Sequence, residues 1–250
     1  MTLSYWEQQH WFTNVDFTIV GSGIVGLQTA LHLKQHHPEA KIVLLERSAL
    51  PEGASTKNAG FACFGSVTEL LTDLHTHTEQ EVVDLVQQRW EGLQVLKDTL
   101  GAEALQLESL GGYELFLEEE APLYQKALSK MEYLNALLYP LFQQKVFSIV
   151  ENTFGFQKVK SSLIYNALEG QLDPGLMMQA LLRKAHSKGL LILNGMEVTG
   201  FTENGTDVEV VTQNCSFPTN KLIITTNGFA QKLLPLEVQP ARAQVLITQP

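Results

Sequence analysis

The sequence predicts an α/β fold in which a parallel sheet, continued by an antiparallel β-meander, is combined with an interleaved α+β region. Three observations support this fold class. Residues 17–47 alternate strand, helix and strand around a glycine-rich turn, two long amphipathic segments occupy the middle of the chain, and strand patterns return after residue 189. The chain has 250 residues and is 44% hydrophobic, which suffices for one large core or two modest ones.

Residues 17–47 have the pattern of a βαβ unit that holds a dinucleotide. An apolar strand enters a glycine-rich turn, a helix is expected over residues 27–35, and a second strand over residues 41–45 ends at Glu46. A carboxylate at that strand end is placed to accept hydrogen bonds from a ribose diol. Because strand, helix and acid occur together, the pattern predicts dinucleotide binding more specifically than glycines alone would.

The turn itself reads Gly21-Ser22-Gly23-Ile24-Val25-Gly26. Gly21 permits the tight turn out of the strand, Gly23 lets the backbone approach a pyrophosphate, and Gly26 lets the helix pack closely on the sheet. The helix N-terminus then offers N–H groups and a partial positive charge to the phosphates. The turn therefore predicts where the phosphates of a dinucleotide bind.

A second glycine-rich segment follows Glu46, over residues 51–66. Its small residues allow close approach of the backbone to a flat or charged ligand, and Ser55, Thr56 and Asn58 offer hydrogen bonds. Phe61, Cys63 and Phe64 are also embedded in this segment, which a solvated loop does not explain. We therefore expect this segment to line a ligand.

The remaining elements are expected in an order that returns to the parallel sheet. Residues 1–15 suit a lead-in helix that packs on the body, or an aromatic lid over a ligand. The other expected elements are helices over 78–100, 121–138 and 174–188, strands within 111–117 and over 190–193, a meander through 196–199, 207–212 and 215–217, a strand over 221–225, and a final strand over 244–250. Because the last strand has no terminator, the chain is expected to be a portion of a longer protein.

Composition limits the partners. A net charge of −10 and a pI of about 5.2 argue against nucleic-acid and anionic-membrane partners. No apolar run of about 18 residues occurs, and no secretory signal is visible, so no membrane span and a cytoplasmic location are expected. Two cysteines are compatible with a reducing compartment. The pair His32 and His36 lacks a third ligand, so no metal site is predicted.

Several separate pieces of the chain resemble the FAD-dependent D-amino-acid oxidase (DAO) family, which includes glycine and sarcosine oxidases. They are the glycine turn of residues 21–26, the Leu44-Leu45-Glu46-Arg47 strand end, residues 53–60, the Gly170-Gln171-Leu172-Asp173-Pro174 segment, and the strand and turn of residues 223–228. They span most of the chain in the expected order. The Ala-Ser-Thr-Lys-Asn-Ala-Gly loop is the most specific of them, although many members carry Arg where this chain has Lys57.

The resemblance implies a Rossmann-like FAD/NAD(P)-binding domain and a set of FAD contacts. The N–H groups of residues 23–26 would face the pyrophosphate, Glu46 the adenosine ribose, and the backbone of Val198 the adenine. The residues implied to bind FAD are Gly21, Gly23, Ile24, Val25, Gly26, Glu46, Arg47, Ser55, Thr56, Asn58, Ala59, Gly60, Val198, Thr226 and Asn227. The implied FAD-binding domain covers residues 1–75 and 155–232, and a partial substrate domain covers 76–154 and 233–250.

The same resemblance implies oxidation of an amine or amino acid. Hydride passes from the carbon that bears the nitrogen to flavin N5, giving an imine, so no general base is required and the catalytic residues stay unknown. Candidates on the substrate side are Arg242, Phe61 and Cys63. The alternatives are an NAD-dependent dehydrogenase and a non-catalytic dinucleotide-binding fragment. The particular substrate, the electron acceptor and the oligomeric state stay open.

Overall fold

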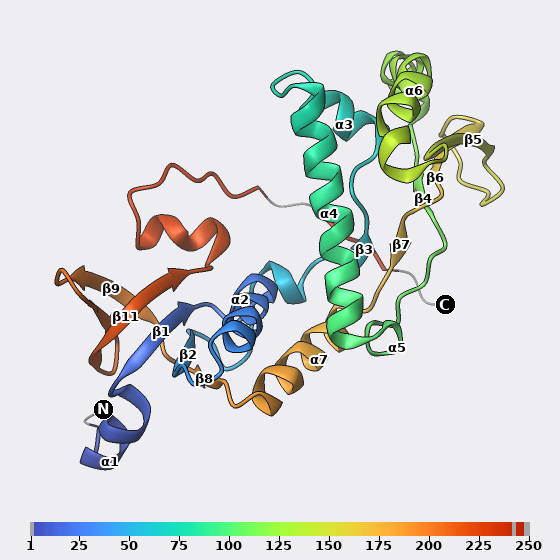
Figure 1. Cartoon of the computed structure of the whole chain (residues 1–250). Helices are drawn as coiled ribbons and strands as arrows, with labels where there is room; N and C mark the ends of the chain where they lie inside the picture. Colours follow the sequence, from blue (N-terminus) through green and yellow to red (C-terminus); the bar gives the residue numbers. More distant parts are fainter. Residues whose placement is uncertain (1–2, 242–243, 248–250) are drawn as a thin grey trace. The chain divides into compact units, whose positions relative to one another are not determined.

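The computed structural model describes residues 3–241 and 244–247, and its contacts divide the chain into two compact units (Figure 1). The first unit is Met1–Ala59 with Pro174–Pro250, and the second is Gly60–Asp173. These bounds differ from the expected domain bounds because residues 155–173 pair with strands of the second unit rather than the first. Which unit carries a cofactor and which a substrate stays a prediction.

The first unit is built on a six-stranded sheet with the order β8-β2-β1-β11-β10-β9. Strands β8, β2, β1 and β11 run parallel, while β10 is antiparallel to both β11 and β9. The expected parallel sheet with a meander is therefore confirmed. The bounds are β1 Val15–Val20, β2 Ile42–Glu46, β8 Leu191–Asn194, β9 Val198–Glu203, β10 Val208–Thr212 and β11 Ser216–Ile224.

Two helices of the first unit lie next to its parallel strands in the chain. Helix α2 (Ile24–His36) joins β1 to β2, and α7 (Pro174–Ser187) precedes β8 and packs against α2. Every residue of β2 is buried, as expected for a parallel strand whose two faces are both covered. The helix expected over residues 27–35 starts three residues earlier, at Ile24, within the glycine turn.

Strand β11 corrects the expectation of two separate strands over 215–217 and 221–225. It is one strand whose first half pairs with β10 and whose second half, from Thr219, pairs with β1. Phe217 and Thr219 are buried, whereas Pro218 and Asn220 between them are exposed. Outward-facing polar residues and a proline interrupted the apolar pattern without interrupting the strand.

The expected lead-in helix is present at one end of the chain, whereas the strand expected at the other end is not. The lead-in segment forms α1 (Tyr5–Glu7) and a π-helical turn, Gln8–Phe12, and the ring of Phe12 packs 4.8 Å from that of Phe217. The strand expected over 244–250 is wrong for residues 244–247, which belong to no strand among the described residues. None of the helices in the described ranges is long and apolar enough to cross a membrane.

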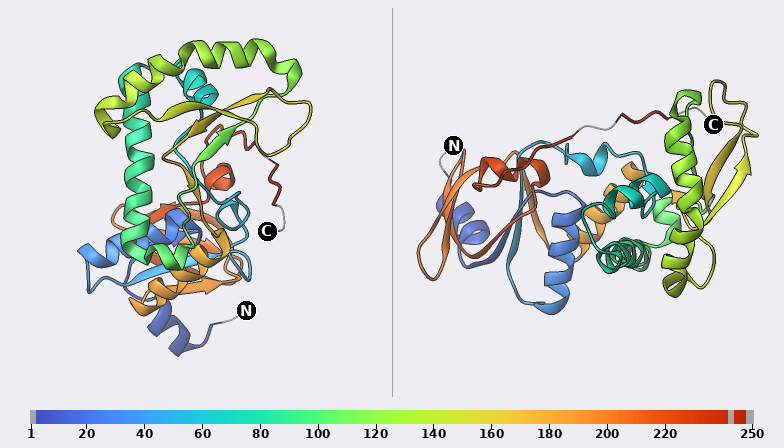
Figure 2. Two further views of the ribbon diagram at one scale, coloured as in Figure 1. Left: turned by 90° about the vertical axis from the view of Figure 1, so that its right-hand side faces the viewer. Right: turned by 90° about the horizontal axis from the view of Figure 1, so that it is seen from above.

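The second unit combines helices with two small antiparallel sheets (Figure 2). In it, α6 runs beside β5 and contacts α3 and α4. The bounds are β3 Phe61–Ala62, α3 Val67–Asp73, α4 Glu79–Leu100, α5 Ala102–Leu105, β4 Gly112–Glu114, α6 Ala121–Phe142, β5 Phe147–Glu151, β6 Ser162–Asn166 and β7 Gly170–Gln171. Short 3₁₀ turns complete both units, at Ala54–Thr56 (η2) and Asn227–Lys232 (η4) in the first and Glu118–Glu120 (η3) in the second.

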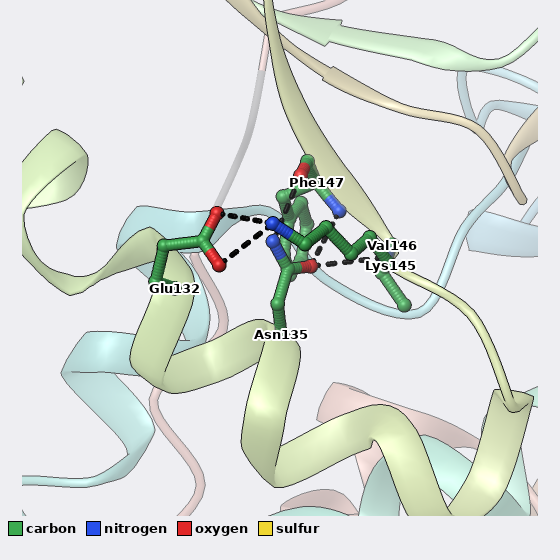
Figure 3. A network of polar contacts seen from close by, with 5 residues as sticks. All are labelled: Glu132, Asn135, Lys145, Val146 and Phe147. Carbon is green, nitrogen blue, oxygen red and sulfur yellow. Dashed lines mark hydrogen bonds and ion pairs between the residues drawn. The ribbon is translucent and has the colours of Figure 1, made fainter.

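A buried asparagine fixes the start of β5 on α6 (Figure 3). Asn135 is 3% exposed, and its Nδ2 donates to the Phe147 carbonyl at 2.9 Å. Its Oδ1 accepts from the N–H groups of Val146 and Phe147, at 2.9 and 2.8 Å. The amide therefore satisfies three buried backbone groups. Beside it, the exposed ion pair of Lys145 and Glu132 spans 2.9 Å.

Candidate functional site

The glycine turn lies at the carboxyl end of β1, where the chain turns to β2 on one side and β11 lies on the other. Such a switch point is where open α/β sheets bind their ligands. Gly21 has a φ of +103°, and a Cβ there would lie 3.2 Å from both the carbonyl and the hydroxyl oxygen of Thr225. A Cβ on Gly26 would overlap the carbonyl oxygen of Gly21. The two glycines are thus required by the close packing of α2 and of the turn after β11.

A serine hydroxyl occupies the N-terminus of α2. The N-cap residue, Gly23, has no side chain to cap the helix, and the Ile24 N–H donates to Ser55 Oγ at 2.9 Å. A Cβ on Gly23 would lie 2.8 Å from that oxygen. A hydroxyl that accepts one hydrogen bond still has its own proton to donate. Ser55, in η2, therefore adds a donor to a helix N-terminus that already favours anions.

Glu46 is held next to the same turn. Its carboxylate is 8% exposed, and Oε2 accepts from both the N–H and the hydroxyl of Ser22, each at 3.1 Å. The other oxygen, Oε1, accepts from the Ser48 N–H at 3.2 Å. Sequence reasoning missed the role of Ser22, although a hydroxyl between the two glycines was a visible signal. The carboxylate is fixed at the end of β2 by these three donors.

The turn after β11 contributes a partly aromatic wall. The Arg47 guanidinium lies 4.3 Å over the ring of Phe229, and the Lys232 ammonium lies 5.8 Å from the same ring. Asn227 has a φ of +47°, and the buried Thr226 hydroxyl has no hydrogen-bond partner among the described residues. A buried polar atom of this kind is commonly satisfied by a bound ligand or water. No sequence pattern pointed to Phe229.

The other expected loop residues fall into two groups. The side chains of Thr56 and Asn58 bond carbonyls of their own loop, at 2.7 Å to Pro51 and 2.9 Å to Ser55, so they shape η2. Ala59 closes this segment of the first unit, whereas Gly60 begins the second, where its carbonyl accepts the Leu172 N–H at 2.8 Å. Val198 starts β9 and is buried. Arg242 lies outside the described residues.

The first unit thus brings Gly21, Gly23, Ile24, Gly26, Glu46, Ser55 and the Thr225–Thr226 turn together at one edge of its sheet. The donor set fits an adenine dinucleotide: N–H groups and a hydroxyl suit a pyrophosphate, and a fixed carboxylate suits a ribose. The unpaired Thr226 hydroxyl is consistent with such a ligand.

Phe61 and Cys63 belong to the second unit, where both line a cavity of about 870 Å³. Partial burial of the thiol, together with the carboxylates of Glu169 and Glu69, raises the pKa of Cys63 to about 11, although Arg89 opposes the shift. A thiol with so high a pKa is a poor nucleophile at neutral pH. In the described part of the chain, no three side chains of His, Cys, Asp or Glu lie together in a way that could hold a metal ion.

Comparisons with known proteins agree with this architecture. The bifunctional protein ThiO/ThiG of Synechocystis is 25% identical over 243 residues, which cover 94% of this chain and 33% of that protein. Glycine oxidase from Geobacillus kaustophilus superposes with a TM-score of 0.63 at 17% identity, over 87% of this chain and 56% of that one.

L-amino acid deaminase from Proteus myxofaciens, solved with anthranilate, superposes with a TM-score of 0.62 at 18% identity, over 87% and 46% of the two chains. The chain therefore spans about a third to a half of the length of these relatives. A profile of the FAD dependent oxidoreductases (DAO) matches residues 16–250, and the chain belongs to this FAD-dependent family.

Proposed function

We propose that this chain binds FAD and acts in the oxidation of an amine or amino acid at its C–N bond. Family membership supports FAD as the cofactor, and the names of two structural neighbours, a glycine oxidase and an L-amino acid deaminase, support the substrate class. When bound, FAD would supply the acceptor for hydride from the carbon that bears the nitrogen, which leaves an imine for water to hydrolyse. The protein contributes binding, orientation and electrostatics.

The observation that carries the proposal is the hydroxyl at the start of α2. Ser55 Oγ accepts the Ile24 N–H at 2.9 Å and would donate its proton to a pyrophosphate oxygen, beside the N–H groups of Val25 and Gly26. Glu46, held by Ser22 at 3.1 Å, would accept from the adenosine ribose. The pyrophosphate and ribose would thus be bound by groups that are already oriented.

The remaining contacts follow from the same placement. The backbone of Val198 would meet the adenine, and Arg47, stacked on Phe229, would border the adenosine side. Thr226 would use its unpaired hydroxyl toward the cofactor, with Asn227 in the same turn. The residues that would follow the cofactor toward the flavin are Thr56, Asn58, Ala59 and Gly60.

The alternative of a nicotinamide-dependent dehydrogenase requires a regular helix after the acidic strand end. In this chain β2 is followed by a single 3₁₀ turn, Ala54–Thr56, and the Ser55 hydroxyl of that turn accepts a hydrogen bond from the start of α2. That arrangement favours FAD over NAD. A non-catalytic dinucleotide-binding module would share the first unit's geometry, so only turnover separates it from an oxidoreductase.

The proposal is tested by mixing the FAD-loaded protein anaerobically with a panel of amines and amino acids and recording the flavin absorbance. Bleaching by at least one compound is expected. Binding of FAD without bleaching by any of them would instead support the non-catalytic module.

A matched pair of variants tests the carrying observation. Ser55→Ala is expected to weaken FAD binding by roughly 10- to 100-fold, because a hydrogen bond to a charged group contributes about 1.5–3 kcal/mol. The control is Ser187→Ala, whose hydroxyl only bonds the Lys184 carbonyl of its own helix, and FAD affinity should not change. Equal affinities for both variants would contradict the assignment of Ser55.

A further inference from the structure

The glycine turn contains a hydroxyl that no ligand touches directly. Ser22 lies between Gly21 and Gly23 and is 0% exposed. Its hydroxyl donates to Glu46 Oε2 at 3.1 Å, because an ionised carboxylate can only accept. A fully buried group acts on a bound molecule only through the residues that it holds. Ser22 therefore influences a ligand of this site through Glu46.

The backbone at the end of β2 is fixed on both sides. On one side, the Gly21 N–H donates to the Leu45 carbonyl at 2.8 Å. On the other side, Glu46 pairs with Asn194 of β8, and the Met196 N–H donates to the Glu46 carbonyl at 2.8 Å. The strand thus fixes where the Glu46 side chain begins, and the orientation of its carboxylate depends on the donors around it.

Three donors of the protein fill most of the acceptor positions of this carboxylate. An ionised carboxylate has about four lone-pair positions, two on each oxygen. Oε2 accepts from both the N–H and the hydroxyl of Ser22, each at 3.1 Å, and Oε1 accepts from the Ser48 N–H at 3.2 Å. These are all the donors to the Glu46 carboxylate within the described residues. One acceptor position is therefore left, and it is on Oε1.

We propose that Ser22 is a positioning residue that makes Glu46 bind a single hydroxyl of the ligand's ribose. This inference rests on the proposed function, in which Glu46 accepts from the adenosine ribose. Ser22 fills both positions of Oε2 and holds the carboxylate so that the remaining position of Oε1 meets the ligand. The sequence pattern predicts a contact with the ribose diol, and the hydrogen bonds of Glu46 narrow that contact to one hydroxyl.

The Ser22 side chain matters because its hydrogen bond goes to a charged group. Such bonds are shorter and stronger than those between neutral groups, so they hold a carboxylate in one orientation. Without the hydroxyl, the Ser22 N–H alone would hold Oε2, and the carboxylate would adopt several orientations. The selectivity for the ribose hydroxyl would then fall, although the fold of the turn is unchanged.

The first test compares ADP with 2′-deoxy-ADP and 3′-deoxy-ADP, each titrated calorimetrically into the FAD-free chain. One of the two deoxy compounds is expected to bind roughly 10- to 100-fold more weakly than ADP, as the loss of a hydrogen bond to a charged group predicts. The other should bind within about twofold of ADP, because its missing hydroxyl does not contact Glu46. Similar losses for both deoxy compounds, or no loss for either, would overturn the proposal.

The second test is Ser22→Ala, which removes the hydroxyl and keeps the N–H. The preference for ADP over the weaker-binding deoxy compound should fall to less than about threefold, while the affinity for that deoxy compound stays within about twofold of the wild-type value. A merely structural role of Ser22 would instead lower the affinity for all three nucleotides alike. That result, or an unchanged preference in a folded Ser22→Ala protein, refutes the role of Ser22.

The control is Thr219→Val, which also removes a buried hydroxyl from the same sheet. Thr219 is 1% exposed, and its hydroxyl donates to the carbonyl of Val15, at the start of β1 and away from the glycine turn. The preference for ADP should match that of the wild type.

Circular dichroism checks the folding of both variants, and the comparison of nucleotides in the wild type decides the selectivity for one hydroxyl even if Ser22→Ala does not fold. If the wild type binds neither FAD nor ADP, the proposed function itself is refuted together with this inference. Binding of both without the expected difference between the deoxy compounds contradicts this inference alone.

Discussion

Replacing Asn135 by leucine removes the amide that joins α6 to the start of β5 while keeping the branched shape of the side chain. The change breaks three hydrogen bonds, one donated to the Phe147 carbonyl and two accepted from the N–H groups of Val146 and Phe147. Both Val146 and Phe147 are 1% exposed, so the freed backbone groups do not reach water without local opening. At about 1 kcal/mol per bond, the expected loss of stability is about 3 kcal/mol.

The assay is urea unfolding of the wild type and the variant, followed by hydrogen exchange at the amides of Val146 and Phe147. Exchange of these two amides should accelerate by roughly 100-fold, as about 3 kcal/mol requires. The matched control is Glu132→Gln, which breaks only the exposed ion pair with Lys145, and should cost less than about 1 kcal/mol. The reasoning is refuted if Asn135→Leu leaves exchange unchanged, or if Glu132→Gln has an equal effect.

Three further predictions test other parts of the structure. Because the pKa of Cys63 is about 11, only about one thiol in a thousand is ionised at pH 8. The rate of its alkylation should therefore rise about tenfold per pH unit up to pH 10. A rate that reaches a plateau near pH 8 would contradict this. Burial raises the pKa of the Glu169 carboxyl above its ordinary value of 4.5, so the wild type should lose stability relative to Glu169→Gln as the pH rises above 4.5. Urea unfolding of both proteins at several pH values measures this difference. A difference in stability that does not depend on pH would contradict the prediction. Gly26→Ala should cost about 1–3 kcal/mol in urea unfolding because its Cβ would overlap the Gly21 carbonyl, whereas Gly53→Ala, with open space around it, should be neutral; equal stabilities would be evidence against the close packing.

Sequence reasoning succeeded where the signal is local. The glycine turn predicted the close packing of the helix, because the requirement at Gly26 comes from the carbonyl of Gly21, five residues earlier in the chain. The apolar run before Glu46 predicted a strand, and every residue of β2 is buried in the structure.

Contacts between residues that are far apart in the chain could not be predicted from the sequence. The hydrogen bond from Ser22 to Glu46 and the stacking of Arg47 on Phe229 depend on which strand ends are neighbours in the sheet. The spacing of residues in the sequence does not show which strand ends are neighbours.

The expected domain bounds, which stay a prediction, differ from the bounds of the two compact units for a related reason. Residues 162–166 form β6, which pairs with β4 on one side and with β5 on the other, and local sequence does not reveal those partners. The contacts therefore divide at Gly60 and Asp173, while the expected bounds followed changes in local pattern.

The most direct test of the central claim is a titration of the 250-residue chain with FAD and with FMN, read by flavin fluorescence and with ADP as a competitor. The groups assembled around α2, Glu46 and Arg47 are suited to the pyrophosphate and adenosine, which FMN lacks. FAD should therefore bind at least about 100-fold more tightly than FMN, and ADP should displace it. Equal binding of FAD and FMN, or no effect of ADP, would contradict the assignment of this site.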